Sequence, residues 1–162
     1  MNLRIALVAL SSVPLLALAP RVEPEPIRVS THLMFQGRAE EALDLYLSLF
    51  EGAEVTAIER NGAEGPGAEG SLSVARVHLP GQELVIFDSP VEHPFTFTPA
   101  VSLFVECDAA AEVDRLVAEL SKDGQVMMPL GEYPFSPRFA WISDRFGVSW
   151  QIGVGVTPKS TR

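Results

Sequence analysis

The segment RAEEALDLYLSLF at residues 38–50 decides the fold, because its helical pattern returns 70 positions later. Its apolar residues lie three and four positions apart, which places them on one face of a helix. Shifted by 70, they fall on an equivalent apolar set: Leu43, Tyr46, Leu47 and Phe50 coincide with Val113, Leu116, Val117 and Leu120. Two amphipathic helices in register indicate an internal repeat.

Strand-forming segments surround both helices in the same order. One strand is predicted before the first helix and three after it, at 28–35, 54–60, 71–79 and 83–88. The second helix is predicted to run to Lys122 with Asp108 as its N-cap, among strands at 100–107, 126–130, 138–143 and 148–153. Pro80-Gly81 and the run from Asp144 to Gly147 are turn signals between the last two strands of each set.

These elements predict an α+β fold of two βαβββ modules, at 28–88 and 99–153, within one domain at 28–154. Each module alone would expose one apolar sheet face. Pairing two modules, within or between chains, would curl the strands into a cup that encloses roughly one small ligand.

Composition narrows the class of partner. The net charge is −9, so nucleic acid and anionic membrane surfaces are not expected partners. Hydrophobic residues make up 47% of the chain, enough for a substantial core. Cys107 is the single cysteine, so an internal disulfide and a cysteine-rich metal site are excluded, and we interpret it as a small buried residue.

The two ends differ from the domain. Residues 1–19 are almost entirely apolar and resemble an export leader, too short for a stable membrane span. The alternative is a start codon assigned too early, so the protein is exported if the leader is real and cytoplasmic otherwise. Residues 20–27 are predicted to be a proline-rich spacer, and 155–162 a polar tail.

Three long motifs resemble the vicinal oxygen chelate superfamily, which includes glyoxalase I and bleomycin-resistance proteins. They are LMFQGRAEEALDLYLSLF (33–50), DSPVEHPFTFTPAVSLFVECD (88–108) and GQVMMPLGEYPFSPRFAWISDRFGVSWQI (124–152). The similarity is greatest to its PhnB-like branch, often labelled demethylubiquinone methyltransferase-like. The resemblance covers about residues 28–154 and implies a homodimer with a sheet-lined cavity, but it does not imply a particular reaction.

Enzymes of this superfamily hold a divalent metal on four inward-facing positions, on the first and last strand of each module. Carried over by spacing, the second module supplies Ser102 and Gln151, and the first supplies Val85 with either His32 or Thr31. Valine cannot bind a metal and serine is a poor ligand. The sequence therefore predicts a cavity without metal. The alternative is that one metal ligand has been assigned to the wrong residue. Asp88 is the nearest carboxylate, and a metal-dependent enzyme would then be expected.

Other motifs give weaker signals. GPGAEG at residues 65–70 matches GxGxxG, but a strand follows it and Glu69 would repel phosphate, so we predict a hairpin loop and no cofactor. The linker at 89–99 could arch over the cavity or form a dimer contact. In the aromatic segment 132–141, Arg138 could bind an anionic or planar ligand, or could be a surface residue beside an apolar wall.

The resulting hypothesis is a PhnB-like protein that binds a small organic molecule without metal. The expected ligand-binding residues are His32, Ser102, Gln151, Arg138, Phe87 and Trp141. Two alternatives stay open: a metal-dependent lyase, isomerase or dioxygenase, and a structural dimer whose cavity is filled by its own side chains. No nucleophile–base pair marks catalytic residues, and the ligand is not identified.

Overall fold

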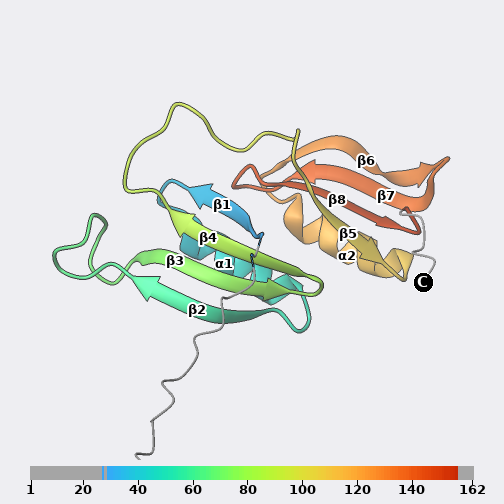
Figure 1. Cartoon of the computed structure of the whole chain (residues 1–162). Helices are drawn as coiled ribbons and strands as arrows, with labels where there is room; N and C mark the ends of the chain where they lie inside the picture. Colours follow the sequence, from blue (N-terminus) through green and yellow to red (C-terminus); the bar gives the residue numbers. More distant parts are fainter. Residues whose placement is uncertain (1–26, 28, 157–162) are drawn as a thin grey trace, which may run out of the picture.

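The computed structural model describes residue 27 and residues 29–156, so the predicted leader, nearly all of the spacer and most of the tail lie outside the described residues. The first module contains β1 (Thr31–Phe35), α1 (Ala39–Leu49), β2 (Glu54–Arg60), β3 (Leu72–Leu79) and β4 (Gln82–Asp88). The second contains β5 (Leu103–Cys107), α2 (Ala110–Leu120), β6 (Gln125–Tyr133), β7 (Ser136–Ser143) and β8 (Ser149–Val154). The predicted α+β fold of two βαβββ modules is confirmed (Figure 1).

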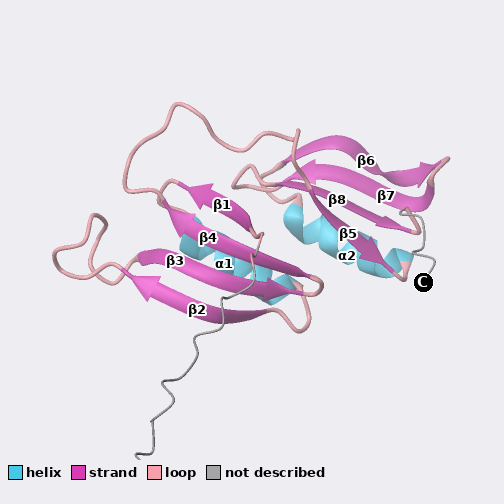
Figure 2. Cartoon of the chain, in the orientation of Figure 1, coloured by secondary structure: helices cyan, strands magenta, loops and turns pink. Residues whose placement is uncertain are grey.

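Each module forms one four-stranded mixed sheet. The strand orders are β1-β4-β3-β2 and β5-β8-β7-β6, so β1 and β5 are edge strands. The first strand of each module runs parallel to the last, and the other pairs are antiparallel. Figure 2 shows both helices behind their sheets, on the same side. The opposite side of each sheet, facing the viewer there, is called the open face below.

Alternation along the strands builds the core between helix and sheet. In β3, Ala75 and Val77 are fully buried, and in β8 so are Trp150 and Ile152. They pack on the predicted helix faces, whose buried members are Ala42, Leu43, Tyr46 and Leu49 in α1 and Val113, Leu116, Val117 and Leu120 in α2. Successive strand residues point to opposite faces, so the residues between them occupy the open face.

The two helices start in different ways. Asp88, at the end of β4, accepts hydrogen bonds at its Oδ1 from the backbone N–H groups of Gly37, Arg38 and Ala39, at 2.7, 3.0 and 3.1 Å. Asp88 therefore caps the N-terminus of α1, although it belongs to strand β4. The prediction that Asp108 is the N-cap of α2 is wrong. The N-cap is Ala109, which makes no side-chain hydrogen bond.

A buried carboxylate joins the two modules. Asp144, 3% exposed, accepts hydrogen bonds at Oδ1 from the backbone N–H groups of Phe146 and Val148. Its Oδ2 accepts from the Tyr46 hydroxyl at 2.7 Å and the Trp150 indole N–H at 2.9 Å. The turn predicted around Asp144 is confirmed, and its carboxylate also binds helix α1 of the other module.

Aromatic rings fill the space around this carboxylate. Tyr46 meets Trp150 edge-on at 5.1 Å between ring centroids, and Phe50 stacks on Trp150 at 5.6 Å. Phe146 contacts Phe35 of β1 at 6.1 Å. The modules are thus held together by a polar network inside an apolar junction.

Strand boundaries shift at the edges. Strand β5 begins at Leu103 rather than residue 100, and β6 extends to Tyr133 through several register shifts. Strand β6 is an edge strand, where Pro129 and irregular pairing are tolerated. A membrane-spanning helix was not found within the described part of the chain.

Candidate functional site

A cleft of about 260 Å³ separates edge strands β1 and β5. We call it the inter-module cleft. The connection between β4 and β5 spans residues 89–102 and is called the linker from here on. The lining of the cleft includes Thr31 and His32 of β1, Phe97, Thr98 and Val101 of the linker, and Ser149 of β8. Both modules and the segment that joins them therefore contribute to one hollow.

Ser149 is the buried polar centre of this cleft, at 2% exposed. Its hydroxyl lies 2.8 Å from the Ser102 hydroxyl and accepts a hydrogen bond from the Trp141 indole N–H at 2.9 Å. Two of the predicted ligand-binding residues, Ser102 and Trp141, are thus oriented by one side chain. The network is uncharged, so it suits a neutral polar group on a ligand.

His32 comes to the cleft from the first module. Its ring lies edge-on to Phe87 at 6.2 Å, and its Nε2 is 3.2 Å from the Ser30 hydroxyl. Residues 32 and 87 point away from the buried Leu33 and Ile86, so both lie on the open face. The alternative candidate Thr31 also lines the cleft, and its Oγ1 accepts from Gln82 at 3.3 Å.

Gln151 lies on the open face beside this network. Its cross-strand partners are Trp141 in β7 and Phe104 in β5. Directly paired residues share a face, so an amide is placed between two aromatic side chains. Five predicted residues therefore lie on the open faces of the two sheets: His32 and Phe87 in the first module, and Ser102, Trp141 and Gln151 in the second.

Arg138 is the sixth predicted residue, and it lies elsewhere. Its guanidinium Nε donates to Asp114 of α2 at 2.6 Å, on the helix side of the sheet. Ala140 and Ile142 lie on the same face of β7 as Arg138, and both are buried in the core. Arg138 is therefore separated from the open face by the sheet itself.

The metal positions of the superfamily can be tested on strand pairing. His32 lies opposite Val85, and Gln151 lies opposite Phe104. The sequence assigned the first metal position of the second module to Ser102. Because β5 begins at Leu103, later than predicted, Phe104 occupies that position instead. Two of the four positions carry only hydrocarbon, so the residues present do not fit a divalent metal.

The remaining titratable groups do not complete such a set. Asp88, the carboxylate that the sequence considered, is committed to the first turn of α1. Among the described residues no three histidine, cysteine or acidic side chains converge to hold an ion. Burial, with the nearby Glu112 charge, raises the pKa of the Cys107 thiol, which disfavours its reactive thiolate form.

The loop at 65–70 joins two antiparallel strands, as predicted. Gly70 N–H donates to Asn61 O at 2.7 Å, and Asn61 N–H donates to Ser71 O at 2.9 Å, which closes the loop above β2 and β3. No helix begins after it, because β3 follows. The loop therefore lacks the helix N-terminus that a dinucleotide phosphate requires.

The linker has a definite place, which the sequence left open. It arches from β4 to β5 (Figure 1), and Gln36 fixes it by accepting from His93 N–H at 2.7 Å. Phe97 packs on Phe35 at 5.0 Å and forms part of the cleft wall, whereas Phe95 is 58% exposed. One aromatic residue of the linker therefore lines the cleft, and another faces solvent.

Sequence reasoning missed two functional features of this region. The contribution of Thr98 and Val101 to the cleft had no local signal, because their segment is irregular. The contact of Asp144 with Tyr46 spans 98 residues, and no local pattern indicates it.

The duplicated modules and their open faces define the fold of the glyoxalase, bleomycin-resistance and dioxygenase proteins, the vicinal oxygen chelate superfamily. A glyoxylase/bleomycin resistance protein/dioxygenase domain from Frankia sp. EAN1pec has the same fold, with a TM-score of 0.57 at 14% identity, over 82% of this chain and 99% of that one.

Within that superfamily, residues 27–153 match the family model described as 3-demethylubiquinone-9 3-methyltransferase, and the chain belongs to this PhnB-like family. A PhnB protein from Bacillus cereus is 48% identical over 79% of this chain and 99% of its own, with a TM-score of 0.75. Protein PA1353 from Pseudomonas aeruginosa is 26% identical over 80% and 98%, with a TM-score of 0.67. No curated protein matches the chain.

Proposed function

We propose that this protein binds a small, partly apolar organic molecule in the inter-module cleft, without a metal ion. The observation that carries the proposal is the convergence of His32 from one module with the Ser149 network of the other. Aromatic walls bind the body of such a ligand, and a few fixed polar groups orient it. Here Phe97 and Phe87 supply apolar surface, and Ser149 and His32 supply polar groups.

The size of the cleft limits the ligand. Its volume of about 260 Å³ lies just below the range of about 300–1,000 Å³ that is usual for ligand pockets. The expected ligand is therefore small, and the uncharged Ser149 network favours a neutral one. Gln151 and Trp141, farther along the open face, would contact a ligand that extends beyond the cleft.

Co-purification tests the proposal even though the ligand is unidentified. The full chain is purified from the cells that naturally produce it, and small molecules are extracted and measured by mass spectrometry. Val101, 73% exposed at the cleft wall, is replaced by Phe to fill the hollow, and Val91→Phe in the same linker is the matched control. We expect Val101→Phe to retain at least about tenfold less of the molecule, and Val91→Phe to retain as much as wild type. Equal retention in all three proteins would contradict the proposal.

Metal analysis of the same preparation tests the second part. Val85 and Phe104 leave His32 and Gln151 as the remaining donors at the superfamily positions, which is too few for a stable site. We expect far less than one divalent ion per chain after dialysis. About one tightly held ion per chain, lost in His32→Ala, would overturn the metal-free proposal and favour a metalloenzyme.

A homodimer is the proposed assembly. The exposed apolar side chains of Val91, Phe95 and Val101 lie along the linker, and Ile58 and Val126 lie on edge strands, a pattern that favours burial by a second copy. Sedimentation velocity is expected to give twice the chain mass. A monomer at micromolar concentration would contradict the proposed assembly and leave ligand binding to be judged by the co-purification result.

A further inference from the structure

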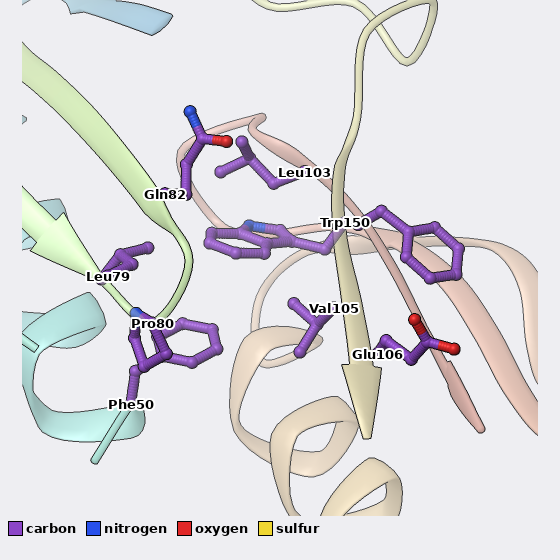
Figure 3. A pocket seen from close by; sticks show the side chains of 9 residues that line it. Phe50, Leu79, Pro80, Gln82, Leu103, Val105, Glu106 and Trp150 are labelled. Carbon is purple, nitrogen blue, oxygen red and sulfur yellow. The ribbon is translucent and has the colours of Figure 1, made fainter. Parts of the chain in front are cut away.

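A second hollow lies where the tip of the β3–β4 hairpin approaches β5 (Figure 3). We call it the junction pocket, and its volume is about 170 Å³. Its lining comes from three places: Phe50 and Trp150, the β3–β4 hairpin with Leu79, Pro80 and Gln82, and strand β5 with Leu103, Phe104, Val105 and Glu106. It shares only Leu103 with the lining of the inter-module cleft, so the two hollows can be tested separately.

The walls of the junction pocket are mostly apolar, and Gln82 and Glu106 are the two polar residues of its lining. Phe50 and Trp150 are stacked at 5.6 Å with an angle of 23° between their rings. The Trp150 indole N–H is already donated to Asp144, so this side chain offers only ring surface to the pocket. Water in such a space has few partners, whereas an apolar molecule gains contacts with the walls.

Gln82 supplies a polar group at one end of the pocket (Figure 3). Its Nε2 donates to Glu83 O at 3.0 Å and to Thr31 Oγ1 at 3.3 Å. These bonds fix the amide and use its donors, and among the described residues no donor is bonded to its Oε1. The remaining capacity of Gln82 is therefore that of an acceptor, which matches a ligand hydroxyl.

We propose that the junction pocket binds a single aromatic ring that carries a hydroxyl group, a ligand of the phenol class. An apolar cavity of about 150 Å³ is enough to hold benzene, so about 170 Å³ suits one ring with a small substituent. The ring packs between the Trp150 and Phe50 side and the Leu103 and Val105 side, and the hydroxyl donates to Gln82 Oε1. This site lies beyond the proposed function and does not depend on it.

The two tryptophans of the chain provide separate reporters. The Trp150 indole N–H lies beside the junction pocket, and the Trp141 indole N–H is bonded to Ser149 beside the inter-module cleft. In ¹H–¹⁵N spectra of the full chain titrated with p-cresol, we expect the Trp150 signal to shift with a midpoint of about 1 mM or below. The Trp141 signal is expected to stay in place.

Three variants sharpen the test. Val105→Phe fills the junction pocket and is expected to weaken p-cresol binding at least about tenfold. Val101→Phe fills only the inter-module cleft and is expected to leave p-cresol binding unchanged. Gln82→Leu, at an exposed position, is expected to weaken p-cresol binding about two- to tenfold. The binding of toluene, which has no hydroxyl group, is expected to stay unchanged. This exposed variant keeps the test decisive if Val105→Phe does not fold.

Several outcomes would overturn the proposal. A Trp150 signal that does not move at millimolar p-cresol would exclude the pocket as a phenol site. A shift of Trp141 alone would place the probe in the inter-module cleft, which supports the proposed function and contradicts this inference. An unchanged response in Gln82→Leu would contradict the role of its carbonyl oxygen.

Discussion

The two βαβββ modules have the same strand order and helix length, yet their polar residues serve different purposes. The first module places a carboxylate, Asp88, at the start of its own helix. The second places a carboxylate, Asp144, in its last turn, where it binds the other module. The duplicated fold therefore preserves apolar periodicity, while each copy has acquired its own polar network.

The open faces differ in the same way. On the paired first and last strands, the first module carries His32 and Val85 and the second carries Phe104 and Gln151. Neither copy alone offers more than one polar side chain in this pair, but the junction brings His32 close to the Ser149 network. The candidate site is thus a property of the pair of modules, and disrupting their junction should affect it.

The largest effect is expected at the carboxylate that joins the modules. In Asp144→Ala, the buried Tyr46 hydroxyl, the Trp150 indole N–H and two backbone N–H groups lose their acceptor. A buried donor left without an acceptor costs about 1–3 kcal/mol, so the loss of four such bonds is expected to cost at least about 3 kcal/mol. Urea denaturation is expected to show this decrease in the free energy of unfolding, and a smaller one in Asp144→Asn. An unchanged unfolding midpoint in Asp144→Ala would refute the role of this network.

The cap of α1 should have the next largest effect. Asp88 accepts from three backbone N–H groups of the first helical turn. Replacement of a helix cap by alanine costs about 0.5–2 kcal/mol, and we expect Asp88→Ala to be near the upper limit. Thermal unfolding measures the loss. Asp88→Asn keeps one oxygen acceptor and is the control, so equal losses in both variants would show that charge rather than capping geometry dominates.

The fold was predictable because its signals are periodic and occur twice. The helix faces around Tyr46 and Leu116 and most strand positions follow from local alternation, and the repeat confirms each copy by the other. The parity that puts Gln151 on the open face was also visible. The same parity places Arg138 on the face of β7 that carries Ala140 and Ile142.

The rest of the site depends on contacts that local patterns do not encode. Asp88 reaches Gly37 across 51 residues, and Tyr46 reaches Asp144 across 98. The start of β5 is set by its pairing with β8, so the sequence alone placed Ser102 where Phe104 stands. Edge strands and linkers have the weakest local signals, and the cleft is built from both.

The stability of the chain at alkaline pH depends on the buried contact between Tyr46 and Asp144. Burial, together with the charge and hydrogen bond of Asp144, raises the pKa of the Tyr46 hydroxyl well above its usual value. In the unfolded chain a tyrosine loses its proton near pH 10, so the folded state binds more protons above that pH and stability falls as pH rises, by about 1.4 kcal/mol per unit.

The variant Tyr46→Phe isolates this contribution. It loses one hydrogen bond, about 1 kcal/mol at neutral pH, and it should flatten the decrease in stability above about pH 10 relative to wild type. Urea midpoints measured between pH 8 and 11 provide the comparison, with Tyr133→Phe, at a half-exposed position, as the control. Parallel pH profiles for wild type and Tyr46→Phe would contradict the assignment.

The uncapped second helix offers a gain in stability. Ala109 has φ −135° and ψ 144°, the extended backbone of an N-cap, and Glu112 lies three residues later. Ala109→Ser would complete the pattern of a capping box and is expected to stabilise the chain by about 0.5–1 kcal/mol. Thermal unfolding of the single variant and of the exposed control Ala110→Ser tests it. A gain in the control alone would show that the helix start lies one residue later.

The smallest effect is expected on the helix side of the second sheet. Arg138 and Asp114 form an ion pair at 2.6 Å, with side chains 32% and 49% exposed, and such partly exposed pairs contribute about 0–1 kcal/mol. Arg138→Ala should therefore lower the free energy of unfolding only slightly and leave retention of the co-purifying molecule unchanged. His32→Ala on the open face should reduce that retention with a similarly small effect on stability. If Arg138→Ala instead lost the molecule, the ligand would lie on the helix side of the sheet, and the assignment of the open face as the binding surface would be wrong.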